Sequence, residues 1–208
     1  IASVKFAKKA VAAGADAVVA EGFEAGGHNG REETTTMVLI PLVRDAVDVP
    51  LIAAGGIGDG RAMAAAFALG AEAVQMGSRF VCSEESSGHE AFKKTVVATE
   101  EGGTMLTLKE LAPVRMIRNK FFGEVQEAYA KCATVDELKQ LLGRARAKRG
   151  MFEGDLDSGE LEIGQVAALL RDIKPAASIV EEVMAEYREV IGRVGTLPRF
   201  DAATGGGA

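Results

Sequence analysis

Three short apolar segments, each followed by a glycine-rich loop, limit what this chain can fold into. They span residues 17–21, 51–54 and 73–76. Each is a continuous apolar run rather than an alternation, which is typical of parallel strands covered on both faces. Stretches with helical periodicity connect them, as right-handed βα crossovers require. The predicted helices before and between these strands span residues 4–13, 37–47 and 61–69.

Three βα units are too few to close a barrel, so they predict either part of a (β/α)₈ barrel or an open doubly wound sheet. Barrels of this kind hold phosphate on the loops after strands seven and eight. If strands 51–54 and 73–76 are the seventh and eighth, the loops that begin at Gly55 and Gly77 are the two phosphate-binding loops. We therefore expect an α/β fold, the C-terminal part of a TIM barrel. Its first five units would lie outside this numbering, because Ile1 reads as the end of a strand and no signal peptide precedes it.

Beyond residue 82 the strand pattern gives way to helical signals. Capping-box sequences begin at Ser87, Thr107 and Thr134. An amphipathic stripe predicts a long helix over 177–194. We divide the chain into barrel units at 1–82, a mainly helical insertion or lid domain at 83–163, C-terminal helices returning to the barrel at 164–198, and a disordered tail at 199–208.

Composition excludes several classes of protein. The 208 residues are 48% apolar and carry a formal net charge of −6, which argues against broad nucleic-acid binding. No apolar run approaches the ~20 residues of a membrane span. Cys82 and Cys132 lack metal-site spacing and read as reduced thiols. We expect a cytoplasmic protein with no metal site and no membrane segment.

The two later glycine loops form a candidate phosphate site. Gly55, Gly56 and Gly77 allow a ligand to approach the backbone closely. Their N–H groups, beside helix N-termini, favour a dianion, and Ser78 adds a hydroxyl donor. Arg79 could add charge or pair with a carboxylate on the barrel rim. A simple tight turn is the alternative for one glycine pair, but the presence of both junctions favours phosphate.

His28 is the candidate proton-transfer group of the first loop. It follows Gly26 and Gly27 at the C-terminal end of strand 17–21, the end that faces the reaction site in barrels. An imidazole titrates near ~6.5, so it can exchange a proton at neutral pH. The alternative is a histidine that only hydrogen-bonds a loop carbonyl. Glu21 could accept a hydrogen bond from a cofactor hydroxyl or ring N–H.

Several other side chains carry weaker expectations. Glu24 should brace its loop, and Gln75 should have a partner, because an unpaired amide inside an apolar strand costs ~1–3 kcal/mol. His89 is assigned to a surface helix. An apolar set, Met105, Met116, Met151, Phe121 and Phe122, could line an acyl pocket or belong to the core. A basic set, Lys139, Arg144, Arg146, Lys148 and Arg149, is either a solvated helix face or a surface that steers an acidic protein.

Three motifs, in this order, resemble one family. Ala20-Glu21-Gly22 with Glu24 to His28, Ile52 to Ile57, and Gln75 to Phe80 resemble the nitronate monooxygenase (2-nitropropane dioxygenase) and enoyl-acyl-carrier-protein reductase II family. The resemblance runs from residue 1 to about residue 195. It implies an FMN-bound (β/α)₈ barrel with a smaller helical domain. The family's flavin contacts on the first strands are not in these residues, so a polypeptide that began at Ile1 would be expected neither to close the barrel nor to bind FMN.

The resemblance also implies roles for individual residues. His28 matches the active-site histidine beside the flavin N5 region. Ala20-Glu21-Gly22 and Arg115 to Asn119 look more like the reductase branch, and Gly164-Gln165 matches a pair that approaches the active site in both branches. The residues expected to contact the cofactor are Glu21, Gly26, Gly27, Gly55, Gly56, Gln75, Met76, Gly77 and Ser78.

The implied activity is that of an FMN-dependent enoyl-acyl-carrier-protein reductase. NADH or NADPH would be the hydride donor, an enoyl thioester on acyl carrier protein the substrate, and a homodimer the possible assembly. One alternative is a nitronate monooxygenase that oxidises alkyl nitronates with O₂. A third hypothesis is a flavin-binding module without turnover.

Overall fold

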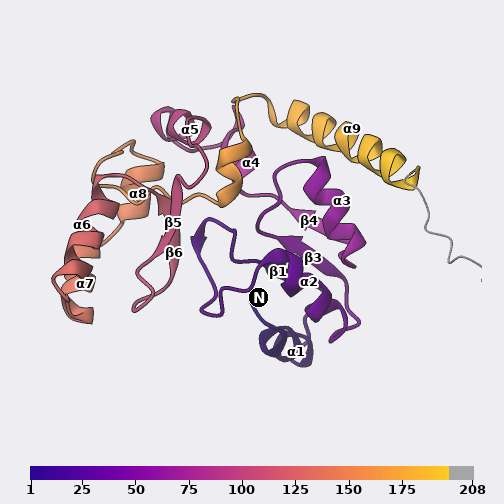
Figure 1. Cartoon of the computed structure of the whole chain (residues 1–208), viewed down its shortest axis with the longest axis horizontal. Helices are drawn as coiled ribbons and strands as arrows, with labels where there is room; N and C mark the ends of the chain where they lie inside the picture. Colours follow the sequence, from indigo (N-terminus) through magenta and orange to yellow (C-terminus); the bar gives the residue numbers. More distant parts are fainter. Residues whose placement is uncertain (197–208) are drawn as a thin grey trace, which may run out of the picture.

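The computed structural model describes residues 1–196, so the tail predicted at 199–208 lies outside the described residues. One lobe holds a parallel sheet in the order β1-β3-β4, covered by three helices (Figure 1). The other lobe holds a small antiparallel sheet and most of the later helices. The first lobe consists of α1 (Val4–Ala12), β1 (Val18–Glu21), α2 (Thr36–Arg44), β3 (Leu51–Ala54), α3 (Gly60–Ala68) and β4 (Ala73–Gln75).

The parallel sheet follows the chain order without a reversal. Val18 pairs with Leu51 and Ile52 pairs with Ala73, so each strand lies beside the next one in sequence. Ile1 extends this sheet at the free edge of β1, where its amine donates to the Val19 carbonyl at 2.7 Å and its carbonyl accepts from Glu21 N at 2.9 Å. Sequential parallel strands joined by helices are the arrangement of a barrel wall.

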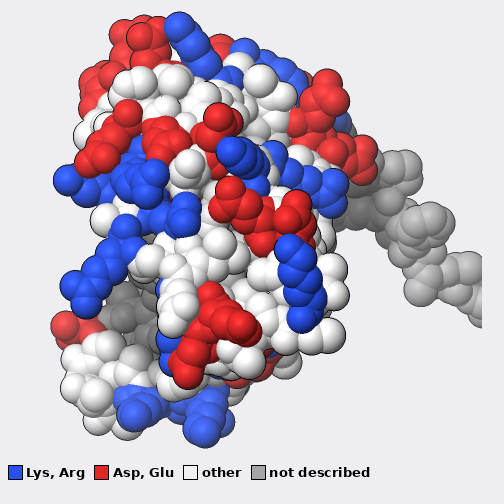
Figure 2. All heavy atoms as spheres, turned by 90° about the vertical axis from the view of Figure 1, so that its left-hand side faces the viewer, with Lys and Arg blue, Asp and Glu red and all other residues white. Residues whose placement is uncertain are grey.

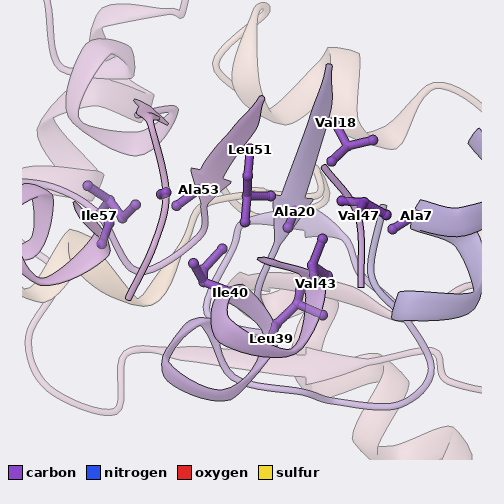
Figure 3. Close-up of a cluster of buried hydrophobic side chains, with 12 residues drawn as sticks. Ala7, Val18, Ala20, Leu39, Ile40, Val43, Val47, Leu51, Ala53 and Ile57 are labelled. Carbon is purple, nitrogen blue, oxygen red and sulfur yellow. The ribbon is translucent and has the colours of Figure 1, made fainter. Parts of the chain in front are cut away.

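The core of the first lobe lies between this sheet and α2. Leu39, Ile40 and Val43 on α2 face Leu51 and the small residues of the strands (Figure 3). These side chains are completely or almost completely buried. The alanines of β1 and β3 leave room for the branched residues of α2, which is why the helix lies close to the sheet. The predicted β-strands and helices of this lobe are confirmed, although α2 ends at Arg44 rather than at residue 47.

The second lobe contains strands as well as the helices that the sequence predicts. It contains an antiparallel sheet in the order β2-β6-β5, with β2 (Gly27–His28), β5 (Thr104–Thr107) and β6 (Val114–Ile117). The capping box predicted at Thr107 is wrong, because Thr107 lies in β5 opposite Val114. All four residues of β6 are buried, so no polar-apolar alternation identified the strand. Through β2, the His28 loop contributes a strand to this lobe, and the division at residue 82 stays a prediction.

The helices of the second lobe begin mostly where polar residues cap them. Thr134 and Glu137 form the predicted capping box. At the Ser87 signal, however, the cap is His89, whose Nδ1 accepts from Ala91 N at 3.1 Å. Residues 165–169 form a 3₁₀ helix, η1 (Gln165–Leu169), instead of the expected α-helix. The other helices of the chain are α4 (Ser78–Val81), α5 (Glu90–Val97), α6 (Lys120–Ala130), α7 (Val135–Leu142), α8 (Arg146–Met151) and α9 (Ala176–Gly195), and α9 packs against α3 of the first lobe.

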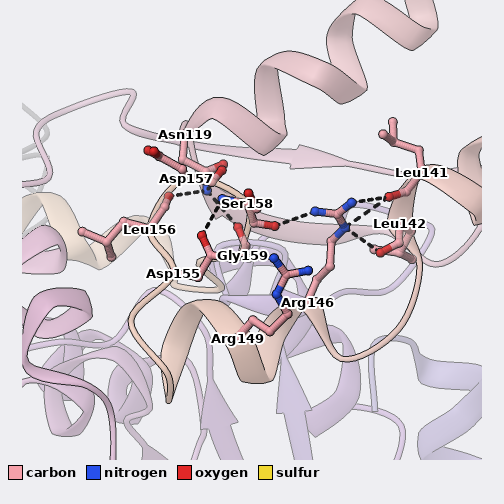
Figure 4. A network of polar contacts seen from close by, with 10 residues as sticks. All are labelled: Asn119, Leu141, Leu142, Arg146, Arg149, Asp155, Leu156, Asp157, Ser158 and Gly159. Carbon is pink, nitrogen blue, oxygen red and sulfur yellow. Dashed lines mark hydrogen bonds and ion pairs between the residues drawn. The ribbon is translucent and has the colours of Figure 1, made fainter.

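The basic set on α7 and α8 is largely paired within the lobe. Arg146 donates to the carbonyls of Leu141, Leu142 and Ser158 (Figure 4). It also lies 4.2 Å from the centroid of the Phe121 ring. Arg149 pairs with Asp155 at 2.6 Å. Figure 2 shows basic and acidic groups interspersed on this side of the molecule. The arrangement fits a solvated helix face better than a positive surface that steers an acidic protein. Arg146 fits neither of these interpretations, because its contacts are structural.

Within residues 1–196, no helix is both long enough and apolar enough to cross a bilayer.

Candidate functional site

The carboxyl ends of the parallel strands open on a pocket of about 180 Å³, which we call the glycine pocket. It is also lined by residues of the segment that joins the second lobe to residues 165–169, namely Glu162, Ile163, Gly164 and Val166. The pocket therefore lies where the two lobes meet. The predicted site residues that line it are Glu21, Gly26, Gly27, Gly55, Gly56, Gln75, Gly77 and Ser78.

Gly55 and Gly56 allow the backbone to turn tightly at the end of β3. Their φ angles are +84° and +69°, a region that other residues rarely adopt. A Cβ on Gly55 would lie 2.6 Å from the Gly22 carbonyl oxygen, so the two loops approach each other too closely for any side chain. This contact explains why the sequence has glycine there whether or not a ligand binds.

The pocket nevertheless fits an anion such as the phosphate of FMN. The backbone N–H groups of Gly56, Gly77 and Ser78 donate to no protein acceptor within the described residues. A Cβ on Gly77 would meet open space, so a ligand can approach its backbone. Because α4 has only four residues, the separate N–H groups provide this fit rather than a helix dipole.

Ser78 connects the two walls of the pocket. Its Oγ accepts a hydrogen bond from Gly164 N at 3.0 Å, which leaves the hydroxyl hydrogen free to donate to a ligand. Gln165 N donates to the Glu24 carbonyl at 2.9 Å nearby. Of the Gly164-Gln165 pair, Gly164 lines the pocket, whereas the Gln165 side chain is exposed and does not line it.

Glu24 braces the loop, as predicted. Its carboxylate accepts from Thr36 N at 3.0 Å and from Thr36 Oγ1 at 2.9 Å, at the first residue of α2. The same Thr36 hydroxyl lies 2.8 Å from the Gly55 carbonyl. Glu24 thus stabilises the N-terminus of α2 and fixes the loop at the end of β3.

The structure corrects the predictions for Gln75 and Met76 and decides between the two alternatives for Arg79. Gln75 is exposed at the end of β4, so it needs no partner; the strand ends before burial would demand one. Met76 does not line the pocket, because its side chain packs against the core of the first lobe. Arg79 is buried and pairs with Asp172 at 2.7 Å, which supports the rim ion pair over a phosphate contact.

Glu21 lines the pocket from the end of β1. It is half-buried, and burial raises the pKa of its carboxyl. Its oxygens can accept a hydrogen bond from a ligand in the pocket. This property suits a contact with a polar ring edge.

His28 lies on β2 opposite Val114, exposed, and does not line the glycine pocket. It lines an adjoining cavity of about 190 Å³, which we call the acid pocket because Glu160 and Glu162 also line it. Glu162 borders both cavities. Neither glutamate was predicted as a site residue. The alternation of Glu160 and Glu162 with the buried Leu161 and Ile163 is the sequence pattern that could have indicated them.

The segment from Arg115 to Asn119 is structural. Arg115 is buried, lies 4.6 Å from the centroid of the Phe23 ring and donates to the Phe23 carbonyl at 3.0 Å, and burial lowers the pKa of its guanidinium. Asn119 caps α6 by accepting from Phe122 N at 3.0 Å. Arg115 holds the loop at Phe23 against the second sheet, and Asn119 fixes the start of α6.

The apolar set divides between core and pocket. Met116 and Phe121 are completely buried, and only Met151 borders the glycine pocket. Within the part of the chain that the structure describes, no group of three His, Cys, Asp or Glu side chains could hold a metal ion.

Comparison with known proteins decides the family. The family model described as nitronate monooxygenase matches residues 1–186. The chain belongs to the nitronate monooxygenase family. Members of this family are flavin-dependent oxidoreductases, and the family-level resemblance drawn from the motifs is confirmed.

Relatives within this family carry different functional names. FabK from Thermotoga maritima is 43% identical with a TM-score of 0.87, over 94% of this chain and 61% of that structure. A probable nitronate monooxygenase of Staphylococcus saprophyticus is 34% identical over 87% of this chain and 53% of its own length. A Rhodococcus jostii protein named as a (3aS,4S,5R,7aS)-5-hydroxy-7a-methyl-1-oxo-octahydro-1H-indene-4-carboxyl-CoA dehydrogenase is 31% identical, over 95% of this chain and 66% of its own length.

The likeness to FabK also decides the fold. The parallel lobe is part of a (β/α)₈ barrel and not of an open doubly wound sheet. The chain spans between 53% and 66% of the length of these relatives.

Proposed function

We propose that this protein is an FMN-dependent reductase of enoyl thioesters carried by acyl carrier protein, with NADH or NADPH as the hydride donor. The observation that carries the proposal is the likeness to FabK. Its sequence identity to this chain is 43%, against 34% for the nitronate monooxygenase relative named above. The Rhodococcus relative is named for a CoA thioester, which also favours thioester chemistry.

The glycine pocket would hold the cofactor. The free N–H groups of Gly56, Gly77 and Ser78 would bind the phosphate, with the Ser78 hydroxyl as a further donor. Glu21 and Gln75 would contact the polar edge of the ring, and Gly26 and Gly27 would leave room for it. When bound, FMN supplies the hydride chemistry, and the protein supplies binding and orientation.

His28 would act from the rim between the two cavities. Its exposed imidazole can protonate the α-carbon of the enoyl thioester or polarise the thioester carbonyl. Glu162, which borders both cavities, would connect this step to the cofactor site.

Nitronate oxidation with O₂ is the second candidate. The family model and the Staphylococcus relative support it by name. In that reaction His28 would act as the base toward a nitroalkane. The two candidates differ in what reduces the flavin, and this difference can be measured.

The deciding experiment is stopped-flow reduction of the flavin in the full-length polypeptide that contains these residues. We expect NADH or NADPH to bleach the flavin absorbance rapidly, and a trans-2-enoyl thioester to restore it without oxygen. Bleaching by an alkyl nitronate alone would contradict the reductase and support the monooxygenase. A colourless protein that does not take up added FMN would contradict both.

His28→Ala provides the first mutational prediction. The variant should retain FMN and lose roughly 10²–10⁴-fold in turnover, the usual contribution of a general acid or base. His89→Ala is the control, because His89 caps α5 and lies in neither pocket. Steady-state kinetics with flavin content measured on the same samples gives the answer, and unchanged turnover in His28→Ala would remove His28 from the mechanism.

A further inference from the structure

The acid pocket contains two carboxyl groups that the proposed function leaves unexplained. Glu160 and Glu162 line it together with His28, opposite an apolar wall that includes Leu108 and Val114. The placement follows from local structure. Ile117 N donates to the Leu161 carbonyl at 2.9 Å, and Glu162 pairs with Met116, so residues 160–163 run extended along β6.

Alternation along this extended segment turns both glutamates the same way. Leu161 and Ile163 point into the core and are almost completely buried. Glu160 and Glu162 therefore point to the opposite side, into the acid pocket. The extended backbone of residues 160–163, paired with β6, therefore places both carboxyl groups on the same side.

Glu160 is largely buried, but its carboxyl borders the acid pocket and has no protein partner within residues 1–196. Only 7% of it is exposed, and within residues 1–196 its carboxyl accepts no hydrogen bond and forms no ion pair. Arg146 lies nearby, but its guanidinium is held by backbone carbonyls and the Phe121 ring. Burial and the neighbouring charge of Glu162 raise the pKa of Glu160 to about 7. Such a carboxyl carries a proton that it can give up near neutral pH.

Glu162 lies beside the backbone of the His28 loop. A Cβ on Gly27 would lie 2.8 Å from Glu162 Oε2, so the carboxylate lies against the backbone directly before His28. Burial raises the pKa of Glu162, and the charge of His28 opposes the rise. The charged and titratable groups that face the pair are therefore His28 on β2 and Arg146 on α8.

We propose that Glu160 and Glu162 are positioning residues that resupply His28 with protons from the acid pocket. The inference rests on the proposed function, in which the N–H bond of His28 breaks as a C–H bond forms at the α-carbon. The O–H bond of the Glu160 carboxyl then breaks, and its proton reaches the ring nitrogen of His28 through Glu162 and through water in the acid pocket that all three side chains line. Glu160 recovers a proton from water, while the two electrons of the reduction come from NADH or NADPH.

The kinetic test compares Glu160→Gln, Glu162→Gln and Glu160→Asp in the flavin-loaded, full-length protein. Wild-type kcat should fall as the pH rises through about 7, because Glu160 then loses its proton. Both Gln variants should lower kcat at pH 6 by roughly ten-fold, less than the ~10²–10⁴-fold of a direct proton donor. Glu160→Gln should also abolish the inflection, and Glu160→Asp should restore it. Glu127→Gln, an exposed carboxylate on α6, should match the wild type.

A second measurement does not depend on turnover. Carboxyl ¹³C NMR of the flavin-loaded protein should show Glu160 titrating near pH 7, and His28→Gln should move the Glu162 midpoint upward. An active wild type whose Gln variants keep its kcat and pH profile would overturn this inference alone. So would a Glu160 carboxyl that titrates in the ordinary acidic range. A wild type inactive on enoyl thioesters would overturn the proposed function and this inference together.

Discussion

At the scale of single residues, Glu24 shows how one side chain stabilises a loop and a helix at once. It accepts hydrogen bonds from the backbone and hydroxyl of Thr36, where α2 begins and Thr35 provides no side-chain cap. Hydrogen bonds to charged groups contribute about 1.5–3 kcal/mol. Glu24→Ala should lower the free energy of unfolding by that amount, and Glu24→Gln by less, because the amide oxygen still accepts.

Urea denaturation measures this difference. Glu32→Ala, an exposed glutamate of the same loop region, is the control and should be neutral within about 0.5 kcal/mol. Equal stability of Glu24→Ala and the control would show that the brace contributes nothing.

The two cysteines should differ sharply in reactivity. Both are free; Cys82 is buried, and burial raises the pKa of its thiol to about 11, whereas Cys132 is exposed. Because the thiolate is the reactive form, a thiol reagent at pH 8 should modify one cysteine per native chain and two after denaturation. Cys132→Ser should remove the fast reaction. Rapid labelling of Cys82 in the native state would contradict the packing described above.

At the scale of elements, α3 and α9 pack through a glycine. A Cβ on Gly60 would collide with Tyr187 N and lie 2.5 Å from the Val183 carbonyl oxygen. Gly60 N also donates to the Glu186 carboxylate at 2.8 Å, so α9 caps α3. Gly60→Ala should separate the two helices and make the amides of α9 exchange faster with deuterium.

Gly192→Ala is the matched control on α9. Its Cβ would meet open space, so the change should raise the helix stability by roughly 0.5–1 kcal/mol. Hydrogen-exchange mass spectrometry separates the two variants. Unchanged exchange of α9 in Gly60→Ala would mean that α9 does not depend on this close approach.

The elements also explain which predictions from sequence succeeded. The strands around Leu51 and Val74 were recognisable because parallel strands covered on both faces are continuous apolar runs. β6 was not predicted, because the charged Arg115 interrupts its short apolar run although all four residues are buried. The stacking of Arg115 on Phe23, 92 residues away in sequence, is a contact that no local pattern encodes.

At the scale of the whole molecule, the acid pocket should make stability depend on pH. Glu160 has a pKa of about 7 in the folded protein against an ordinary 4.5, so the folded state binds more protons between these values. Stability therefore falls as the pH rises from about 4.5 through 7, by roughly 2 kcal/mol after allowance for solvent screening.

Glu160→Gln removes this ionisation, so its stability relative to the wild type should increase over the same pH range. The free energy of unfolding of both proteins, measured from pH 5 to pH 8, tests the prediction. Glu127→Gln should give a curve parallel to that of the wild type. Parallel curves for wild type and Glu160→Gln would show that Glu160 ionises alike in the folded and unfolded states.

The sequence by itself determined the parallel βα units, the glycine loops and the family, because these depend on local periodicity and on short motifs. It also placed most of the glycine pocket, since neighbouring parallel strands end at one edge of the sheet. Only the tertiary structure decided that His28 belongs to a second sheet and borders a separate cavity with Glu160 and Glu162. His28 and the two glutamates meet because β6 pairs with both β2 and residues 160–163, although more than 130 residues of chain separate these two segments.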